Sequence, residues 1–308
     1  MDDFIYAQLH IPKTAGYTFR YHVQKNLKEE QQLLLDYAPL GLDIYNPPLD
    51  YEIYKQYCWR YLSSLSKSRK RKIRVIHGHL VHYGVDEFFE KPIRYFTYIR
   101  NPIDRTLSVY KYLCFLYKHD GDKDDKVQYF RRTLLLNNNI PNFDVWLMKK
   151  YQSVSIKGHL SMYGHLKFNG YIDNSISKES IKKALDKFYF IGLSENFSKE
   201  ILFFYDKLGM HKYFIDQNIS EKNYDNSIKM VNKGEILKRN TLDNLIYEYG
   251  KTLNVRYKNE NKYFLERIKR KSLERKIMLP LTQLVFASRQ TMIRVSKRIF
   301  KRERLFAK

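Results

Sequence analysis

The sequence predicts an α/β fold, with a central parallel sheet flanked by helices in a single domain, followed by a basic helical C-terminal tail. Short apolar runs of strand length alternate with helix-like stretches, and this alternation favours a parallel sheet. No segment of the sequence repeats. The 308 residues are 44% hydrophobic, enough to build a core. We expect the domain over residues 1–258 and the tail over residues 259–308.

The expected elements follow from apolar runs, helix caps and prolines. Strands are predicted over residues 4–11, 74–79, 95–99 and 188–193. Helices are predicted over residues 17–30, 102–118, 127–151 with a break at 137–141, 177–187, 197–208 and 241–253. Pro102 suits a first helical turn, and Ser177 suits a helix N-cap. The acidic, polar stretch over 120–126 indicates a surface loop, whereas 31–72 and 152–175 show little recognisable pattern.

The net charge limits the partners of the chain. The chain has 56 basic and 33 acidic residues, a balance of +23, so its natural partners are polyanions, phosphate-rich cofactors or anionic membrane surfaces. Residues 262–308 hold fifteen Lys or Arg and three Glu, which gives +12 and leaves +11 for residues 1–261. Charge alone does not choose among these partners.

The tail has apolar residues at helical spacing, with basic residues distributed around them. The apolar positions are Leu281, Leu284, Val285, Met292, Val295 and Ile299. Such a basic amphipathic helix could make a peripheral contact with an anionic membrane, or it could be a solvated helix packed on the body of the protein. The sequence leaves both open, as it does the oligomeric state.

The cellular compartment is predicted from three patterns that the sequence lacks, namely a disulfide framework, a signal peptide and a membrane span. Cys58 and Cys114 are too few for a disulfide framework and lie far apart in the chain, so no zinc motif is present. The sequence shows neither a signal peptide nor an apolar stretch long enough for a membrane span. We therefore expect a cytoplasmic protein.

The first chemical motif is His-Ile-Pro-Lys-Thr-Ala-Gly-Tyr-Thr over residues 10–18, between a strand and a helix. A helix N-terminus offers unpaired N–H groups that bind phosphate, and ligands of open α/β sheets lie at the carboxyl ends of the strands. Lys13 supplies a charge, Gly16 a close backbone approach, and Thr14 and Thr18 hydroxyls. Because Tyr17 follows the glycine, this is no Walker A loop, and ATP or GTP hydrolysis is not supported.

The second motif is Ile-Arg-Asn-Pro over residues 99–102, where another strand enters a helix. Arg100 ends the strand, and Ser108 lies on the helix, so the guanidinium and the hydroxyl could converge on one anion. Two anion sites on separate strand-to-helix turns indicate a ligand with two phosphate-type groups.

Three histidines, His77, His79 and His82, follow a third strand. Their spacing resembles a metallo-hydrolase pattern, but Val81 stands where such a motif carries an aspartate, so no metal is expected. A neutral imidazole can instead remove a proton from a hydroxyl group.

Together these residues resemble the carbohydrate sulfotransferases related to heparan sulfate and uronosyl 2-O-sulfotransferases. The loop at 10–18 resembles their 5′-phosphosulfate loop, the segment at 99–108 their 3′-phosphate motif, and His77-Gly78-His79 their His-Gly-His. Later segments at 190–197 and 240–247 also resemble family landmarks. The resemblance implies a P-loop-NTPase-like domain that transfers a sulfuryl group from 3′-phosphoadenosine-5′-phosphosulfate (PAPS) to a carbohydrate hydroxyl.

The resemblance also implies roles for particular residues. Lys13 would contact the 5′-phosphosulfate and His79 would be the general base, with His77 orienting it or taking that role itself. Arg100 and Ser108 would hold the 3′-phosphate. The loop residues implied to bind the co-substrate are Lys13, Thr14, Ala15, Gly16, Tyr17 and Thr18.

This sequence departs from the family at two positions, where Tyr17 replaces a small residue and Asn101 replaces the commoner aspartate. Two other classes remain open: a metal-dependent hydrolase that uses His77, His79 and His82, and a non-catalytic polyanion or nucleic-acid binder. We favour the enzyme, with no metal and no nucleic-acid partner, and expect acceptor specificity to lie in residues 31–72 and 152–175.

Overall fold

The structure is a computed structural model of the 308-residue chain. It describes the residues 3–43, 51–120, 124–151, 160–172, 177–214, 233–261 and 263–284. Its centre is a five-stranded sheet with the order β2-β3-β1-β4-β5, in which every pair is parallel. The strands are β1 (Ile5–Leu9), β2 (Gln32–Leu34), β3 (Val75–Gly78), β4 (Ile93–Ile99) and β5 (Phe190–Leu193).

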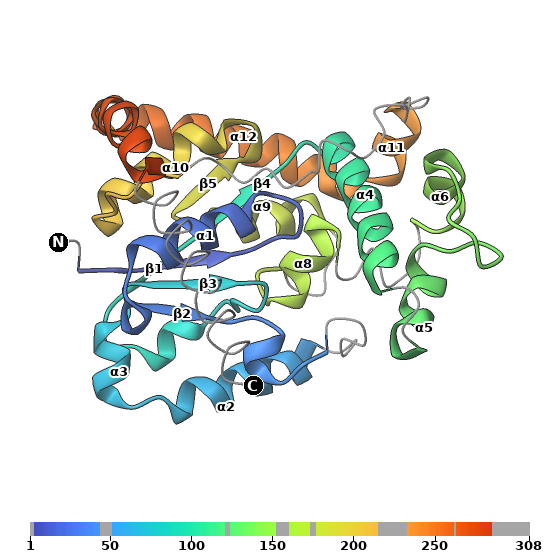
Figure 1. Ribbon diagram of the computed structural model, residues 1–308, viewed down its shortest axis with the longest axis horizontal. Coiled ribbons are helices and arrows are strands. Elements are labelled where there is room, and N and C mark those ends of the chain that lie inside the picture. Colours follow the sequence, from blue (N-terminus) through green and yellow to red (C-terminus); the bar gives the residue numbers. More distant parts are fainter. Residues whose placement is uncertain are drawn as a thin grey trace, which may run out of the picture.

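Helices cover both faces of this sheet (Figure 1), so the strands are buried on both sides, as parallel sheets require. Alternate side chains of β1 divide between the two cores. Ile5, Ala7 and Leu9 pack in one core with α2 (Tyr51–Ser64), α8 (Met162–Phe168), α9 (Lys178–Asp186) and α12 (Thr241–Glu260). Tyr6 packs in the other core with α1 (Gly16–Asn26) and α10 (Phe197–Leu208). The predicted fold class is confirmed.

A third apolar cluster lies beside the sheet, around the buried indole of Trp146. It is formed by α4 (Pro102–Asp120), α5 (Asp124–Thr133), α6 (Phe143–Lys149) and α11 (Lys233–Arg239), which lie together at the right of Figure 1. The short helix α3 (Lys67–Lys72) precedes β3. Pro102 does begin α4, and the Asn101 side chain caps it by accepting the N–H of Ile103 at 2.9 Å.

Most predicted elements are present, and the differences are local. The surface loop expected over 120–126 is wrong in part, because α5 already begins at Asp124. In 31–72 the structure has β2, α2 and α3, which the sequence pattern did not reveal. β2 has only three residues, and the many aromatic residues of α2 blur a helical period. Helix α12 continues to Glu260, across the boundary expected at 258/259.

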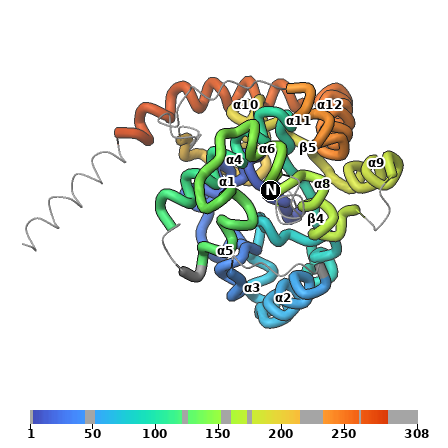
Figure 2. Tube along the Cα trace, turned by 90° about the vertical axis from the view of Figure 1, so that its right-hand side faces the viewer, coloured from blue at the N-terminus to red at the C-terminus, as the bar shows by residue number. Residues whose placement is uncertain are grey.

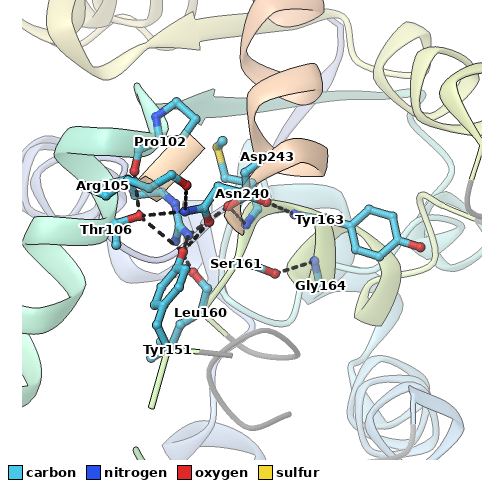
Figure 3. A network of polar contacts seen from close by, with 12 residues as sticks. Pro102, Arg105, Thr106, Tyr151, Leu160, Ser161, Tyr163, Gly164, Asn240 and Asp243 are labelled. Carbon is cyan, nitrogen blue, oxygen red and sulfur yellow. Dashed lines mark hydrogen bonds and ion pairs between the residues drawn. The ribbon is translucent and has the colours of Figure 1, made fainter. Parts of the chain in front are cut away.

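A buried polar network joins α4, α8 and α12 (Figure 3). The carboxylate of Asp243 lies 2.9 Å from the Arg105 guanidinium and also accepts the backbone N–H groups of Met162 and Tyr163, at 3.1 and 2.9 Å. Arg105 is fully buried and also donates to the Leu160 carbonyl. Its charge is therefore used to hold helices together, although it stands in the Arg-Asn-Pro motif segment.

Among the residues that the structure describes, no helix combines the length and the apolar character needed to cross a membrane.

The Asp243 network generates the first prediction. Asp243→Ala leaves the Arg105 guanidinium buried without its counter-ion and two backbone N–H groups unpaired, so we expect the free energy of unfolding to fall by about 3–5 kcal/mol. Urea denaturation measures this loss. In the matched control, Glu179→Ala removes an exposed ion pair with Lys182 and should change stability by less than about 1 kcal/mol. Equal effects of the two variants would contradict the role given to Asp243.

Candidate active site

The carboxyl ends of all five parallel strands open on one edge of the sheet, where ligands of open α/β sheets bind. β1 lies at the centre of the sheet, with Leu9 in register with Gly78 of β3 and Thr97 of β4. Charged or titratable residues follow every strand at this edge. They are His10 and Lys13 after β1, Asp36 after β2, His79 after β3, Arg100 after β4 and Glu195 after β5.

The loop between β1 and α1 has a constrained backbone. Lys13 and Ala15 both adopt positive φ, at 67° and 70°, which costs energy for residues with a Cβ. A Cβ at Gly16 would lie 1.8 Å from Cδ2 of His10, so only glycine fits against that ring. The Thr14 hydroxyl donates to the Ile11 carbonyl at 2.8 Å and so stabilises the loop itself. This path starts α1 at Gly16, with its first N–H groups unpaired within the helix.

The other residues of the loop differ in exposure. The side chain of Tyr17 is exposed, whereas Thr18 is buried in the first turn of α1. Ser108 lies half-buried two turns into α4. Its convergence with Arg100 on one anion stays a prediction.

Two cations meet beside this loop. Nη1 of Arg100 lies 3.4 Å from the carbonyl oxygen of Lys13, which ties the end of β4 to the β1–α1 loop. Nζ of Lys13 lies 4.4 Å from the ring centroid of Tyr112. Neither cation forms an ion pair with a carboxylate in the described part of the chain. Burial, and then the charge of Arg100, lower the pKa of Lys13 to about 8. A bound anion would offset both effects, because it stabilises the charged form of Lys13.

His79 has a defined hydrogen-bonding state. Its Nδ1 lies 2.6 Å from the backbone carbonyl oxygen of His10. A carbonyl only accepts, so Nδ1 carries the proton and Nε2 keeps its lone pair. The His10 ring stacks on the His79 ring at 3.9 Å, and the His165 ring meets it edge-on at 5.6 Å. Burial lowers the pKa of His79, an effect that the Asp36 carboxylate opposes. The imidazole is therefore a neutral proton acceptor at neutral pH.

His77 differs from its neighbour. It is 1% exposed, and neither ring nitrogen has a hydrogen-bond partner among the described residues. Burial lowers the pKa of His77 to about 3. The half-buried His79, with one nitrogen held by a carbonyl, is the better placed of the two to meet a substrate.

His82 is fully buried, and its Nδ1 lies 2.9 Å from the carbonyl of Leu80. In the segments that the structure describes, no group of three or more His, Cys, Asp or Glu residues is arranged to hold a metal ion. His77, His79 and His82 therefore do not form such a group there.

Several residues of the site were not singled out from the sequence. His10 had a usable signal, because it directly follows a central strand. Asp36 follows the unpredicted β2, and its ion pair with Arg20 at 3.2 Å could not be read from spacing. His165 and Tyr112 lie on α8 and α4, and only packing brings them to this edge.

Known proteins show only a weak similarity to this chain. No protein-family model matches the sequence, and no curated protein matches it. Among solved structures, the chain is similar to a sulfotransferase from Alicyclobacillus acidocaldarius, at 14% identity and a TM-score of 0.39, covering 81% of this chain and 94% of that one. A likeness at this level carries no weight by itself, so the function has to be inferred from the residues of this chain.

The geometry around His79 predicts its tautomer. Nitrogen-15 NMR of the imidazole rings at neutral pH should show His79 neutral with the proton on Nδ1, and should place its pKa below the ordinary 6.5 because burial disfavours the charged ring. The resonances of His79 are identified by their absence from the spectrum of the His79→Ala variant. A proton on Nε2 at neutral pH would contradict the proposed hydrogen bond.

The lowered pKa of Lys13 predicts how anion binding depends on pH. Lys13 is charged below about pH 8 and loses its proton above it. Its affinity for a phosphate-type anion, with adenosine 3′,5′-bisphosphate as the probe, should therefore fall as the pH rises through 8, by up to about tenfold per pH unit. Isothermal titration calorimetry measures this. The variant Lys13→Arg serves as the control. Its side chain stays charged throughout this range, so its affinity for the nucleotide should not change with pH. A flat profile in the unmodified chain would exclude Lys13 as the titrating contact.

Proposed function

We propose that this protein is a sulfotransferase that moves the sulfuryl group of PAPS to a hydroxyl group of a carbohydrate acceptor. One observation carries the proposal. At one edge of the sheet, the half-buried cations Lys13 and Arg100 form no ion pair among the described residues. They lie with a neutral histidine, His79, whose Nε2 is not used by its bond to the His10 carbonyl.

The anion site suits a ligand with phosphate groups at both ends of a nucleoside. Lys13 and the N-terminus of α1 offer a charge and unpaired N–H groups to the phosphosulfate end. Arg100 offers paired donors for the 3′-phosphate, and we assign Ser108 to the same group. Thr14, Ala15 and Gly16 give the loop its shape, while Tyr17 and Thr18 flank it.

The reaction is an in-line displacement at sulfur. The S–O bond to the 5′-phosphate breaks as the acceptor oxygen bonds to sulfur, and negative charge develops on the leaving phosphate oxygen. Lys13 stabilises that charge. Nε2 of His79 takes the hydroxyl proton, and the imidazolium that forms is stabilised by the nearby Asp36 carboxylate. The products are a sulfate ester and adenosine 3′,5′-bisphosphate, so no metal is needed to balance the step.

His79 also indicates where the acceptor would lie. The rings of Tyr37 and His165 approach His79 at centroid distances of 6.1 and 5.6 Å. Tyr37 follows β2 and His165 lies on α8, so both come from segments in which we expected acceptor specificity. The carbohydrate class of the acceptor rests on the family resemblance of the motifs.

Alanine variants test the two roles separately. His79→Ala should lower sulfate transfer by about 10²–10⁴, because the base is lost, yet leave binding of adenosine 3′,5′-bisphosphate nearly intact. Lys13→Ala should lower transfer by about 10²–10³ and weaken nucleotide binding as well. Transfer of radiolabelled sulfate from PAPS to a panel of glycans measures turnover, and calorimetry measures binding.

His119→Ala is the matched control, because His119 is exposed near the end of α4, away from the strand ends. It should leave turnover and binding unchanged. If His79→Ala abolished nucleotide binding, the division of roles would be wrong. If no glycan accepted sulfate while the chain still bound polyanions, the protein would be a binder and not an enzyme.

A further inference from the structure

The C-terminal helix over residues 264–284 is fixed to the body of the protein by its inner face. The side chain of Phe264 is fully buried in the core between the sheet and α10. Asp206 of α10 pairs with Arg267 at 3.0 Å and also with Arg270. Further along, Arg275 donates to the carbonyl of Ser198 at 2.8 Å. The first part of the predicted tail is therefore a packed helix and not a loose appendage.

The outer face of the same helix is apolar and exposed. Leu273, Ile277, Leu281 and Leu284 are spaced by four, four and three residues, which places them on one side of a helix. Their exposed fractions are 63, 60, 51 and 68%. Single exposed leucines are ordinary on protein surfaces, but a continuous stripe marks an interaction site. Figure 2 shows this end of the helix projecting beyond the rest of the described chain.

The charges around the stripe decide which partner fits. Lys269 and Lys276 are exposed on the same helix, and residues 264–284 hold six basic and two acidic residues, a balance of +4. In a dimer of two such helices, on a chain of net charge +23, like charges would face each other. An anionic lipid surface instead offers hydrocarbon to the stripe and opposite charge to the lysines.

We propose that the stripe of Leu273, Ile277, Leu281 and Leu284 docks this protein on an anionic membrane surface, with Lys269 and Lys276 contacting lipid headgroups. Because the inner face of the helix stays packed on α10, docking requires no unfolding and would hold the body at the membrane surface. The inference goes beyond sulfuryl transfer and does not depend on it.

Vesicle co-sedimentation of the full-length chain tests the proposal. Vesicles of equal parts phosphatidylcholine and phosphatidylserine should bind the protein, and pure phosphatidylcholine vesicles should bind it far less. The triple variant I277Q/L281Q/L284Q should bind anionic vesicles at least about tenfold more weakly, because the stripe can no longer enter the interface. The variant K269Q/K276Q should bind about 25-fold more weakly at low salt, about fivefold for each lysine.

The control variant I53Q/V255Q removes exposed apolar side chains from α2 and α12 and should bind vesicles like the unmodified chain. Circular dichroism melting must show that each variant is folded. Equal vesicle binding by the triple variant, or no binding by the unmodified chain, would overturn the proposal. A dimer in sedimentation analysis that the triple variant abolishes would also overturn it, because the stripe would then bind a second copy.

Discussion

The site and the fold both depend on one constraint, namely that every strand of the sheet is parallel and β1 lies at its centre. Parallel strands expose all their carboxyl ends at one edge, so residues separated by dozens of positions in the chain become neighbours there. The Lys13 loop, His79 and Arg100 meet only because β3 and β4 flank β1 on either side. Burial of both faces by helices then fixes the strand ends, and the buried pair of Arg105 with Asp243 holds α4, which carries Ser108, to the same framework.

Electrostatics at this edge is dominated by desolvation. Burial lowers the pKa of Lys13 and of His79, but the two residues gain different properties from the same effect. For the lysine, burial and a second cation nearby weaken the charged form, which a bound anion would stabilise. For the histidine, burial keeps the ring neutral, and the bond of Nδ1 to a backbone carbonyl leaves the lone pair on Nε2. His10 links the two, because its carbonyl holds His79 and its ring packs against Gly16.

Much of the fold could be predicted from the sequence, because apolar runs and caps are local signals. Ser177 caps α9 as expected, and α10 has the predicted bounds. β2 is too short for a periodic signal, and the aromatic residues of α2 obscure its helical pattern. The C-terminal tail was also predicted from the spacing of apolar residues. Of the six apolar positions that predicted an amphipathic helix, only Leu281 and Leu284 are described. Within 264–284 one face of the helix packs on the body and the other face is exposed. The part beyond residue 284 lies outside the described residues.

The sequence by itself determined the α/β class, the two strand-to-helix turns rich in phosphate-binding residue types, and the histidines that follow β3. These features are local, and each can be recognised within about ten residues. Only the tertiary structure separates the two histidines, because His77 and His79 differ in burial and hydrogen-bond partners and not in residue type. The tertiary structure likewise shows that Arg105 forms a buried ion pair between helices. It also shows that Asp36, Tyr112 and His165 lie at the candidate site. Burial and long-range contacts are set by how the chain packs, and no local pattern in the sequence records them.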